Sequence, residues 1–215
     1  MAIPLLALYL PLQFVVPLIM VVDFSASAVL GRGTRQHARW DEVRFLLPAS
    51  ALGIILGITL LINLPRQPLL TGLGVFVLLF GLRSVFNLHG EQHISRWWAV
   101  PAGLTGGMIG ALFGTGGPPY VIYLSHRLRD KSELRATFSA LFLIDGGLRI
   151  ITFSITGLLW QSHIVLALLG ALPLMALGLY AGHRIHIGLS TSQMQGIIGG
   201  LLLLSGASLL WKAWA

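Results

Sequence analysis

The stretch GGMIGALFGTGGPPYVIYL, residues 106–124, decides the fold of this 215-residue chain. It closes an apolar segment, 98–124, that has the length of a membrane helix, for which roughly 20 residues suffice. Five of the weakest helix formers nevertheless fall within six residues of it: Gly114, Gly116, Gly117, Pro118 and Pro119. The fold must therefore tolerate a broken backbone inside an apolar segment.

The composition places the chain in a membrane. Hydrophobic residues make up 55% of it and charged residues 10%, and the mean hydropathy is +0.83. Soluble domains carry about 25% charged residues. The apolar segments are far longer than barrel strands, so the expected class is an all-α integral membrane protein. The start, MAIPLLALYLPLQFVV, has no basic region and is read as mature protein rather than a signal peptide.

Charge, cysteine and histidine content narrow the chemistry. The net charge of +7 is expected to orient loops, not to bind nucleic acid. The absence of cysteine excludes disulfides and thiol chemistry. Two histidine pairs, His89 with His93 and His183 with His186, have spacings that a metal could use. Neither pair has a convincing third ligand, so surface histidines, no metal and no cofactor are expected.

The apolar segments form two similar halves. LPASALGIILG (47–57) matches LPLMALGLYAG (172–182) at an offset of 125 residues, and both copies carry a small-xxx-small face on which helices can pack closely. We therefore expect two repeats, 1–90 and 91–215. The first has three residues before Pro4, where the second has about twenty before the matching Pro119. Either the true start lies upstream of Met1 or half an element has been lost, so the first repeat is read as truncated. The expected segments are 2–10, 13–31, 45–64, 69–88, 98–124, 136–160, 164–182 and 194–214.

The basic residues decide how 98–124 meets the membrane. If this segment crosses as one broken helix, seven basic residues face six, which is no bias. If it enters and leaves by the same face, the loops 32–44, 83–97 and 125–135 share a side with Arg184. Eleven basic residues then oppose Arg66 and Lys212, as cytoplasmic loops require.

The glycines and prolines are accordingly predicted to form the tip of a re-entrant hairpin, in preference to a purely structural kink. The 32–44 loop, Ser84 and Ser132 would be cytoplasmic, and Gln67 and Gln161 would lie outside. Each repeat then has a re-entrant or broken helix plus three crossings, so the two repeats are inverted. Inverted repeats with broken helices are typical of secondary transporters.

Several stretches together resemble the sulfite exporter TauE/SafE family. In the second half these are the opening stretch, ELRATFSALFLIDGGLR (133–149), TGLLW (156–160) and LPLMALGLYAGHRI (172–185). In the first half they are the basic loop GRGTRQHARWDEVRF (31–45) and LLPASALGIILGITLL (46–61). The resemblance covers nearly the whole chain. The chain departs from the family pattern at its amino terminus, where half of a motif is missing.

This resemblance implies a multi-pass transporter of the bacterial inner membrane that moves sulfite, a sulfonate or a related small anion. The expected partners are that anion and the lipid bilayer, and a homodimer is left open. A membrane enzyme is not expected, because no HExxH, G-x-S-x-G or paired-aspartate motif is present. The alternative is a non-transporting assembly or scaffold subunit.

Three ionisable residues lie inside the apolar segments, namely Asp23, Asp145 and Arg149. Each would cost about 2.5–3.5 kcal/mol at a helix centre, so each is a functional candidate. Asp145 and Arg149 are spaced to form an ion pair on a helix, which either binds the substrate or only holds the bundle together. Asp23 and Asp145 are the candidates for a residue that takes part in ion coupling or that is simply a buried charge.

The hairpin tip supplies the remaining candidates for binding an anion. Backbone N–H groups at Thr115, Gly116 and Gly117 would meet the positive end of a helix dipole, and Arg149 would add a planar fork that suits sulfonate or sulfite oxygens. Thr137 and Ser139 are read either as hydroxyl donors or as helix-packing residues. No catalytic residue is expected.

Overall fold

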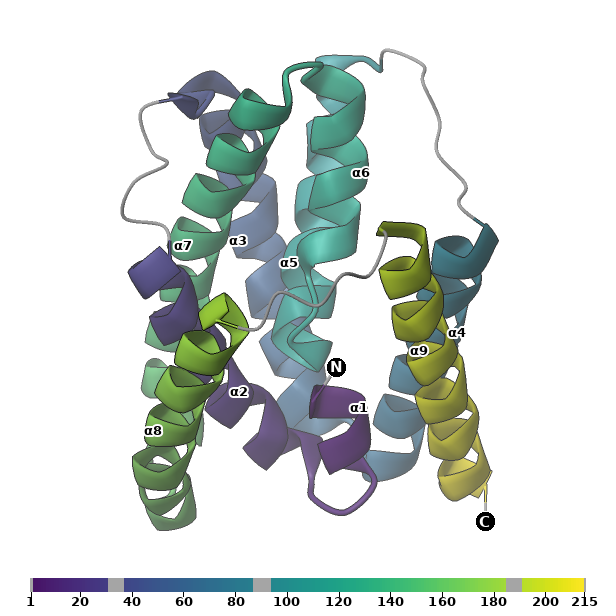
Figure 1. Ribbon diagram of the computed structural model, residues 1–215. Helices are drawn as coiled ribbons and strands as arrows, with labels where there is room; N and C mark the ends of the chain where they lie inside the picture. The colour runs from purple at the N-terminus through teal and green to yellow at the C-terminus, as the bar shows by residue number, and fades with distance from the viewer. Residues whose placement is uncertain (1, 31–36, 87–93, 185–190, 215) are drawn as a thin grey trace.

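A computed structural model describes residues 2–30, 37–86, 94–184 and 191–214, and its ordered elements are all helical over these ranges (Figure 1). Four helices are long and apolar enough to cross a membrane: α2, α3, α7 and α8. Apolar stretches of α4 and α9, Arg66–Phe80 and Gly200–Trp214, are shorter over the described residues. The helices are α1 Ala2–Ala7, α2 Leu12–Leu30, α3 Trp40–Asn63, α4 Arg66–Phe86, α5 Ala99–Phe113, α6 Gly117–Arg127, α7 Lys131–Ile155, α8 Ser162–Arg184 and α9 Thr191–Trp214, with 3-10 turns η3 Arg96–Trp98 and η4 Leu158–Trp160.

α3 and α7 begin five residues earlier than hydropathy predicts, because polar first turns extend them beyond their apolar parts. α3 starts with Asp41 and Glu42 in its first turn, where carboxylates interact favourably with the helix dipole. Asp130 caps α7 by accepting hydrogen bonds at 2.8 Å from the backbone N–H groups of Ser132 and Glu133. The charged turns lie outside the apolar segments that the sequence marks as spans.

The segment 98–124 is broken where its glycines and prolines predict. α5 ends at Gly114, which adopts the left-handed conformation (φ 65°) that glycine tolerates best, and α6 begins three residues later at Gly117. With 15 and 11 residues, both helices are shorter than a membrane crossing requires. The start of α5 and the end of α6 lie at the same end of the molecule (Figure 1). The pair is therefore a hairpin.

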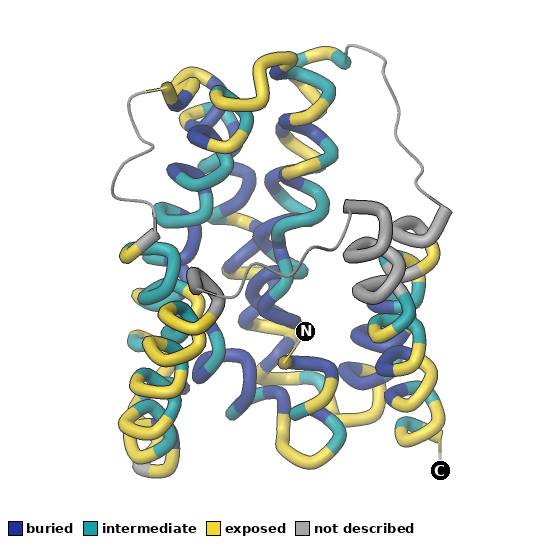
Figure 2. Tube along the Cα trace, in the orientation of Figure 1, coloured by how far each residue is buried: buried dark blue, intermediate teal, exposed yellow. Residues whose placement is uncertain are grey.

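Glycines let α5 lie directly against α3. A Cβ at Gly53 would stand 2.9 Å from the backbone nitrogen of Met108, and one at Gly107 would stand 3.1 Å from that of Ile54. Glycine is required here because the two backbones touch. The matching face of α8 differs, since a Cβ at Gly178 would meet nothing within 4 Å. Figure 2 accordingly shows α5 largely buried and α3 buried along one side, whereas α8 is largely exposed.

α4 and α9 form a second close pair beside the hairpin (Figure 1). Gly74 of α4 and Gly206 of α9 face one another, and a Cβ on either would come within 3.2 Å of the other's carbonyl oxygen. The lower part of the molecule shares one apolar core, which joins this pair to α1, α3 and the hairpin tip through Ile3, Leu61, Leu73, Phe113 and Leu209. Among the described side chains, the helix pair thus packs on the rest of the molecule through this lower core.

Candidate functional site

An ion pair lies in the interior, between Asp145 and Arg149 of α7. The two side chains are 1% and 0% exposed, and Arg149 Nη2 donates to Asp145 Oδ2. The spacing of four residues places both on one face of α7, with the acid nearer the amino end. The ion pair expected from the sequence is present, and it is buried among five helices.

The other oxygen of Asp145 is held by hydroxyl groups from two further helices. Oδ1 accepts a hydrogen bond from Tyr120 of α6 at 2.8 Å and another from Ser50 of α3. The two hydroxyl oxygens lie 2.8 Å from each other. Asp145 therefore has three donors, which is what an ionised carboxylate needs when it is buried.

Arg149 is less completely satisfied than its partner. A guanidinium has five N–H donors. Nη2 binds Asp145, Nη1 has only a weak contact with the sulfur of Met20 at 3.8 Å, and Nε has no hydrogen-bond partner among the described residues. Unmet donors on a buried cation are costly, so the guanidinium of Arg149 can bind an additional acceptor.

The glycines of the hairpin make room for this polar cluster. A Cβ at Gly110 would overlap the guanidinium of Arg149, and one at Gly116 would stand 2.6 Å from Arg149 Nη2. Gly106 leaves the same kind of space for the ring of Tyr120, since a Cβ there would lie 2.6 Å from Cζ. The hairpin therefore presses its glycine face onto the buried fork of α7.

The hairpin turn has its own unmatched polar group. The Oγ1 of Thr115 is buried and has no hydrogen-bond partner among the described residues. Gly117 begins α6, and a Cβ there would stand 3.5 Å from the ring of Phe138, which is an ordinary contact. Pro118 and Pro119 lack N–H groups, so the α6 amino terminus keeps its dipole but offers fewer backbone donors than most helix starts.

The candidates named from the sequence divide into two groups. Arg149, Asp145 and Gly116 lie together, and Thr115 is in the same turn. Asp23 lies apart: it is exposed on α2 and makes no hydrogen bond or ion pair with a described residue. Thr137 is occupied elsewhere, because its hydroxyl accepts the backbone N–H of Arg39 at 2.9 Å.

Ser50, Tyr120 and Met20 were not predicted to lie at this site. Ser50 offers one signal in the sequence, since the matching position of the second repeat is the apolar Met175. A polar residue in one copy of an apolar repeat is a reason to look for a partner. Tyr120 follows the two prolines directly, but nothing local indicates that its hydroxyl reaches α7.

A second charged cluster joins the outer ends of the hairpin to α3. Glu42 is 2% exposed and accepts hydrogen bonds from Arg127 at 2.8 and 3.3 Å and from the hydroxyl of Tyr123. Arg96, just before α5, lies 3.9 Å from the same carboxylate and donates to the backbone oxygen of Asp41 at 2.7 Å. One acidic side chain thereby ties both hairpin arms to the first turn of α3.

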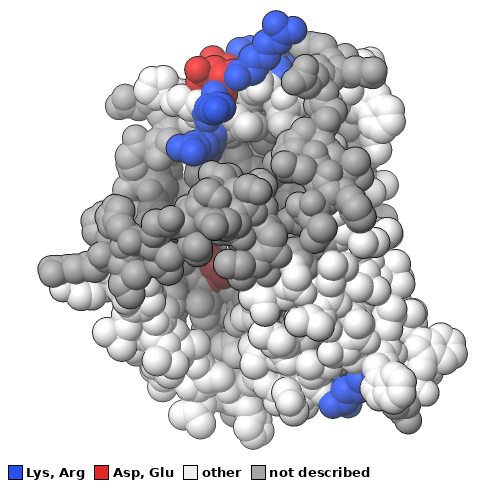
Figure 3. All heavy atoms as spheres, turned by 45° about the vertical axis from the view of Figure 1, so that its right-hand side comes forward, with Lys and Arg blue, Asp and Glu red and all other residues white. Residues whose placement is uncertain are grey.

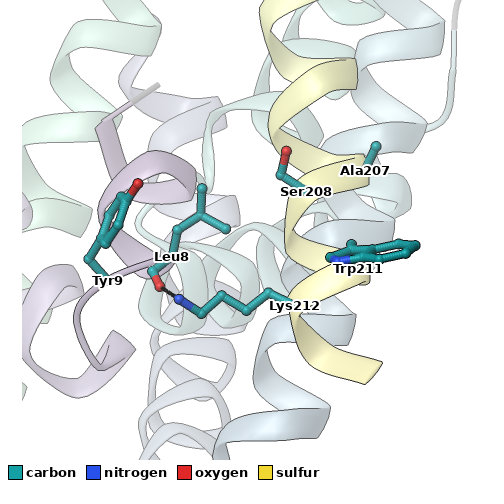
Figure 4. Close-up of a pocket in the computed structure, with 6 residues that line it drawn as sticks. All are labelled: Leu8, Tyr9, Ala207, Ser208, Trp211 and Lys212. Carbon is teal, nitrogen blue, oxygen red and sulfur yellow. Dashed lines mark hydrogen bonds between the residues drawn. The ribbon is translucent and has the colours of Figure 1, made fainter. Parts of the chain in front are cut away.

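A cavity of about 630 Å³ lies at the other end of the molecule, between α1 and α9 (Figure 4). Its lining is mostly apolar, and its cation, Lys212, already donates to the backbone oxygen of Leu8 and lies 5.4 Å from the ring of Tyr9. Lys212 is exposed. This cavity has no buried unpaired donor and is a weaker candidate than the cluster around Arg149.

Metal binding finds no support in the part of the chain that the structure describes, which contains no group of three potential ligands. His89, His93 and His186 lie outside the described residues, as does the side chain of His183. The site chemistry therefore rests on the buried cation, the hydroxyl groups and the hairpin turn.

Comparisons with known proteins find relatives that are similar over most of the chain. The chain is 29% identical over 202 residues to "Probable inner membrane transporter protein TsaS" of Comamonas testosteroni, covering 92% of this chain and 83% of the relative. It is 24% identical over 208 residues to "Probable sulfite/organosulfonate exporter TauE" of Cupriavidus necator, covering 94% and 80%. No solved structure matches.

A family model decides the assignment. The model for "Sulfite exporter TauE/SafE" matches residues 1–209, which is nearly the whole chain. Proteins of this family are membrane transporters and not enzymes, and the apolar helices agree with a multi-pass membrane protein. The chain belongs to the sulfite exporter TauE/SafE family.

Proposed function

We propose that this protein is a secondary transporter of a small oxyanion, such as sulfite or an organosulfonate, and that the anion binds between Arg149 and the hairpin turn. The observation that carries the proposal is the guanidinium of Arg149, fully buried with its Nε unpartnered. The printed names of the two relatives support the substrate class.

The chemistry of the cluster favours an oxyanion over a cation or an apolar solute. A guanidinium presents parallel N–H groups that match two oxygens of a sulfite or sulfonate. The hydroxyl of Thr115 and the positive end of α6 lie on the hairpin turn that packs on the same fork. Gly110 and Gly116 keep this surface free of Cβ atoms.

We also propose that the chain is built from two inverted repeats, 1–90 and 91–215, in the bacterial inner membrane. In Figure 1, α7 and α9 run downward and α8 upward, whereas their counterparts α2 and α4 run upward and α3 downward. This alternation is what inversion requires. Basic side chains gather at the upper end of the face in Figure 3, which suits a cytoplasmic side.

The direct test is uptake of labelled sulfite, methanesulfonate and benzenesulfonate by proteoliposomes that contain the purified chain. We expect saturable uptake of at least one of them by the wild type. Arg149→Lys replaces a fork with a point charge, so half-saturation should require about tenfold to a hundredfold more anion. Arg44→Lys is the matched control, since Arg44 is exposed near the start of α3.

A double variant separates binding from folding. Arg149→Gln alone leaves Asp145 unpaired, which harms a buried site whatever the function. Asp145→Asn combined with Arg149→Gln removes both charges at nearly constant size. We expect the double variant to be produced and inserted normally but to be inactive. Restored uptake in the double variant would reduce the ion pair to a packing role.

A further inference from the structure

The buried ion pair is electrically neutral and has no second counterion. The hydrogen bonds and ion pairs of Asp145 and Arg149 in the described part of the chain involve no other charged side chain. The groups that face the pair from the helices packed around it are Ser50 of α3, Tyr120 of α6, Met20 of α2 and the glycine face of α5.

An anion bound to Arg149 changes this balance. Two negative charges would then face one positive charge, away from water and inside a membrane. Neutralising one of the two negative charges, or moving it away from the other, is strongly favoured, because an unpaired buried charge is costly. The anion and the carboxylate also compete for the guanidinium of Arg149. Asp145 holds it through a single nitrogen, Nη2, so this one contact is the one that a bound anion would displace.

The surroundings of Asp145 suit a carboxyl group in either protonation state. Oδ1 is held by two hydroxyl groups, and these do not depend on Arg149. Each hydroxyl can donate or accept, so both partners remain usable when the carboxyl gains a proton. Oδ2 bonds to Arg149 Nη2 and is the atom that loses its partner when an anion takes the fork.

We propose that Asp145 takes up a proton at Oδ2 each time an anion binds Arg149, so that one anion and one proton move together. The empty site, with Asp145 ionised and Arg149 charged, is neutral. The loaded site, with the acid protonated and the anion on Arg149, is neutral as well. This inference rests on the proposed function and adds its coupling ion.

Asp23 supplies a matched comparison for this role. It falls near Asp145 when the two halves of the sequence are compared, and it also lies in a candidate membrane span. It is exposed and makes no hydrogen bond or ion pair with a described residue. Within the described ranges it has no paired cation from which a bound anion could release it, so we assign the coupling role to Asp145.

The experiment uses proteoliposomes with wild type, Asp145→Asn or Asp23→Asn, and labelled methanesulfonate and benzenesulfonate as probes. Both probes stay anionic at every pH used, so a proton that moves with them must be carried by the protein. With the outside acidic, one-to-one coupling should raise accumulation about tenfold for each pH unit of gradient. Wild type and Asp23→Asn should respond in this way, whereas any exchange of labelled for unlabelled anion by Asp145→Asn should not respond to the gradient.

Each alternative result has a defined meaning. Two results would overturn proton coupling and leave the transporter proposal intact. One is wild-type exchange that does not depend on the pH gradient. The other is accumulation by Asp145→Asn that still depends on the gradient. Absence of exchange of any oxyanion by folded wild type would overturn both. If Asp145→Asn does not fold, a pH-sensitive dye inside wild-type vesicles still tests whether a proton enters with each anion. Addition of the probe without a gradient must then acidify the lumen by one proton per anion.

Discussion

At the scale of single residues, glycine does two different jobs in the hairpin. Gly114 supplies a left-handed backbone conformation at the end of α5, whereas Gly110 supplies empty space for the guanidinium of Arg149. The first role concerns the fold of the turn and the second concerns the site. A methyl group added at Gly110 would act through overlap alone, because the backbone there is ordinary helix, whereas at Gly114 the left-handed backbone would itself be strained.

Gly110→Ala is therefore expected to damage the site despite alanine's better helix propensity, which is worth about 1 kcal/mol. The new methyl group would overlap Arg149, and overpacking of this kind typically costs about 1–3 kcal/mol. We expect a lower melting temperature in detergent and weaker anion uptake. Gly170→Ala on α8 is the control, because a Cβ there meets nothing within 4 Å. Equal behaviour of the two variants would contradict the packing that we describe.

At the scale of elements, the hairpin is anchored along its length and at its ends. Along its length, α5 rests on the glycine face of α3. At its ends, Glu42 binds Arg127 at the end of α6 and approaches Arg96, which precedes α5. Short helices gain little from their own backbone bonds, so these anchors fix how deep the turn reaches.

Glu42→Gln removes the charge from this anchor and keeps its shape. Hydrogen bonds to charged groups contribute about 1.5–3 kcal/mol, so we expect a loss of stability of that order. Asp41→Asn is its neighbouring control. Asp41 is about half exposed and pairs with Arg39 and Arg96 at the surface, where a salt bridge contributes about 0–1 kcal/mol. Thermal unfolding of both variants in the same detergent compares them, and an equal loss would show that Glu42 is not a buried anchor.

At the scale of the whole molecule, the described basic side chains on one side come from the start of α3, η3 and the connection from α6 to α7. At the opposite end lie the start of α4, with Arg66, and the end of α9, with Lys212. This separation orients a membrane protein. The orientation that we propose depends on the hairpin, since a continuous crossing by 98–124 would mix the two groups.

Cysteine labelling tests the orientation without interference, because the chain has no native cysteine. We expect Ser132→Cys, at the start of α7, to react with an impermeant maleimide only after the cells are opened. Gln161→Cys, just before α8, should react in intact cells. Labelling of position 132 from outside would exclude the topology, and uptake assays would confirm that both variants are folded.

Local features of the sequence were sufficient for the break and for the ion pair. Five weak helix formers in six residues predict a turn whatever surrounds them, and a spacing of four residues predicts the contact of Asp145 with Arg149. Both depend on residues that are near each other in the chain. The small-xxx-small face of α3 was likewise confirmed by its contact with α5.

Contacts between distant helices could not be predicted in this way. Ser50 and Tyr120 reach Asp145 across 95 and 25 residues, which depends on how three helices cross. Asp23 falls near Asp145 when the two repeats are compared, yet Asp145 is buried and Asp23 is exposed. Glu42 was read as part of a basic loop, and its burial follows only from the packing of the hairpin ends against α3.

The shortness of the hairpin has an electrical consequence. With 15 and 11 residues, its arms are about 22 and 16 Å long, so its turn lies roughly halfway across a hydrocarbon core of about 30 Å. An uncompensated charge moved from one face to Arg149 would cross roughly half of the membrane voltage, worth about 1 kcal/mol at 100 mV. A site that is neutral both empty and loaded does not sense this field. Uptake by the wild type should thus be unchanged by an imposed potassium diffusion potential, whereas Asp145→Asn, positive when empty, should become voltage dependent.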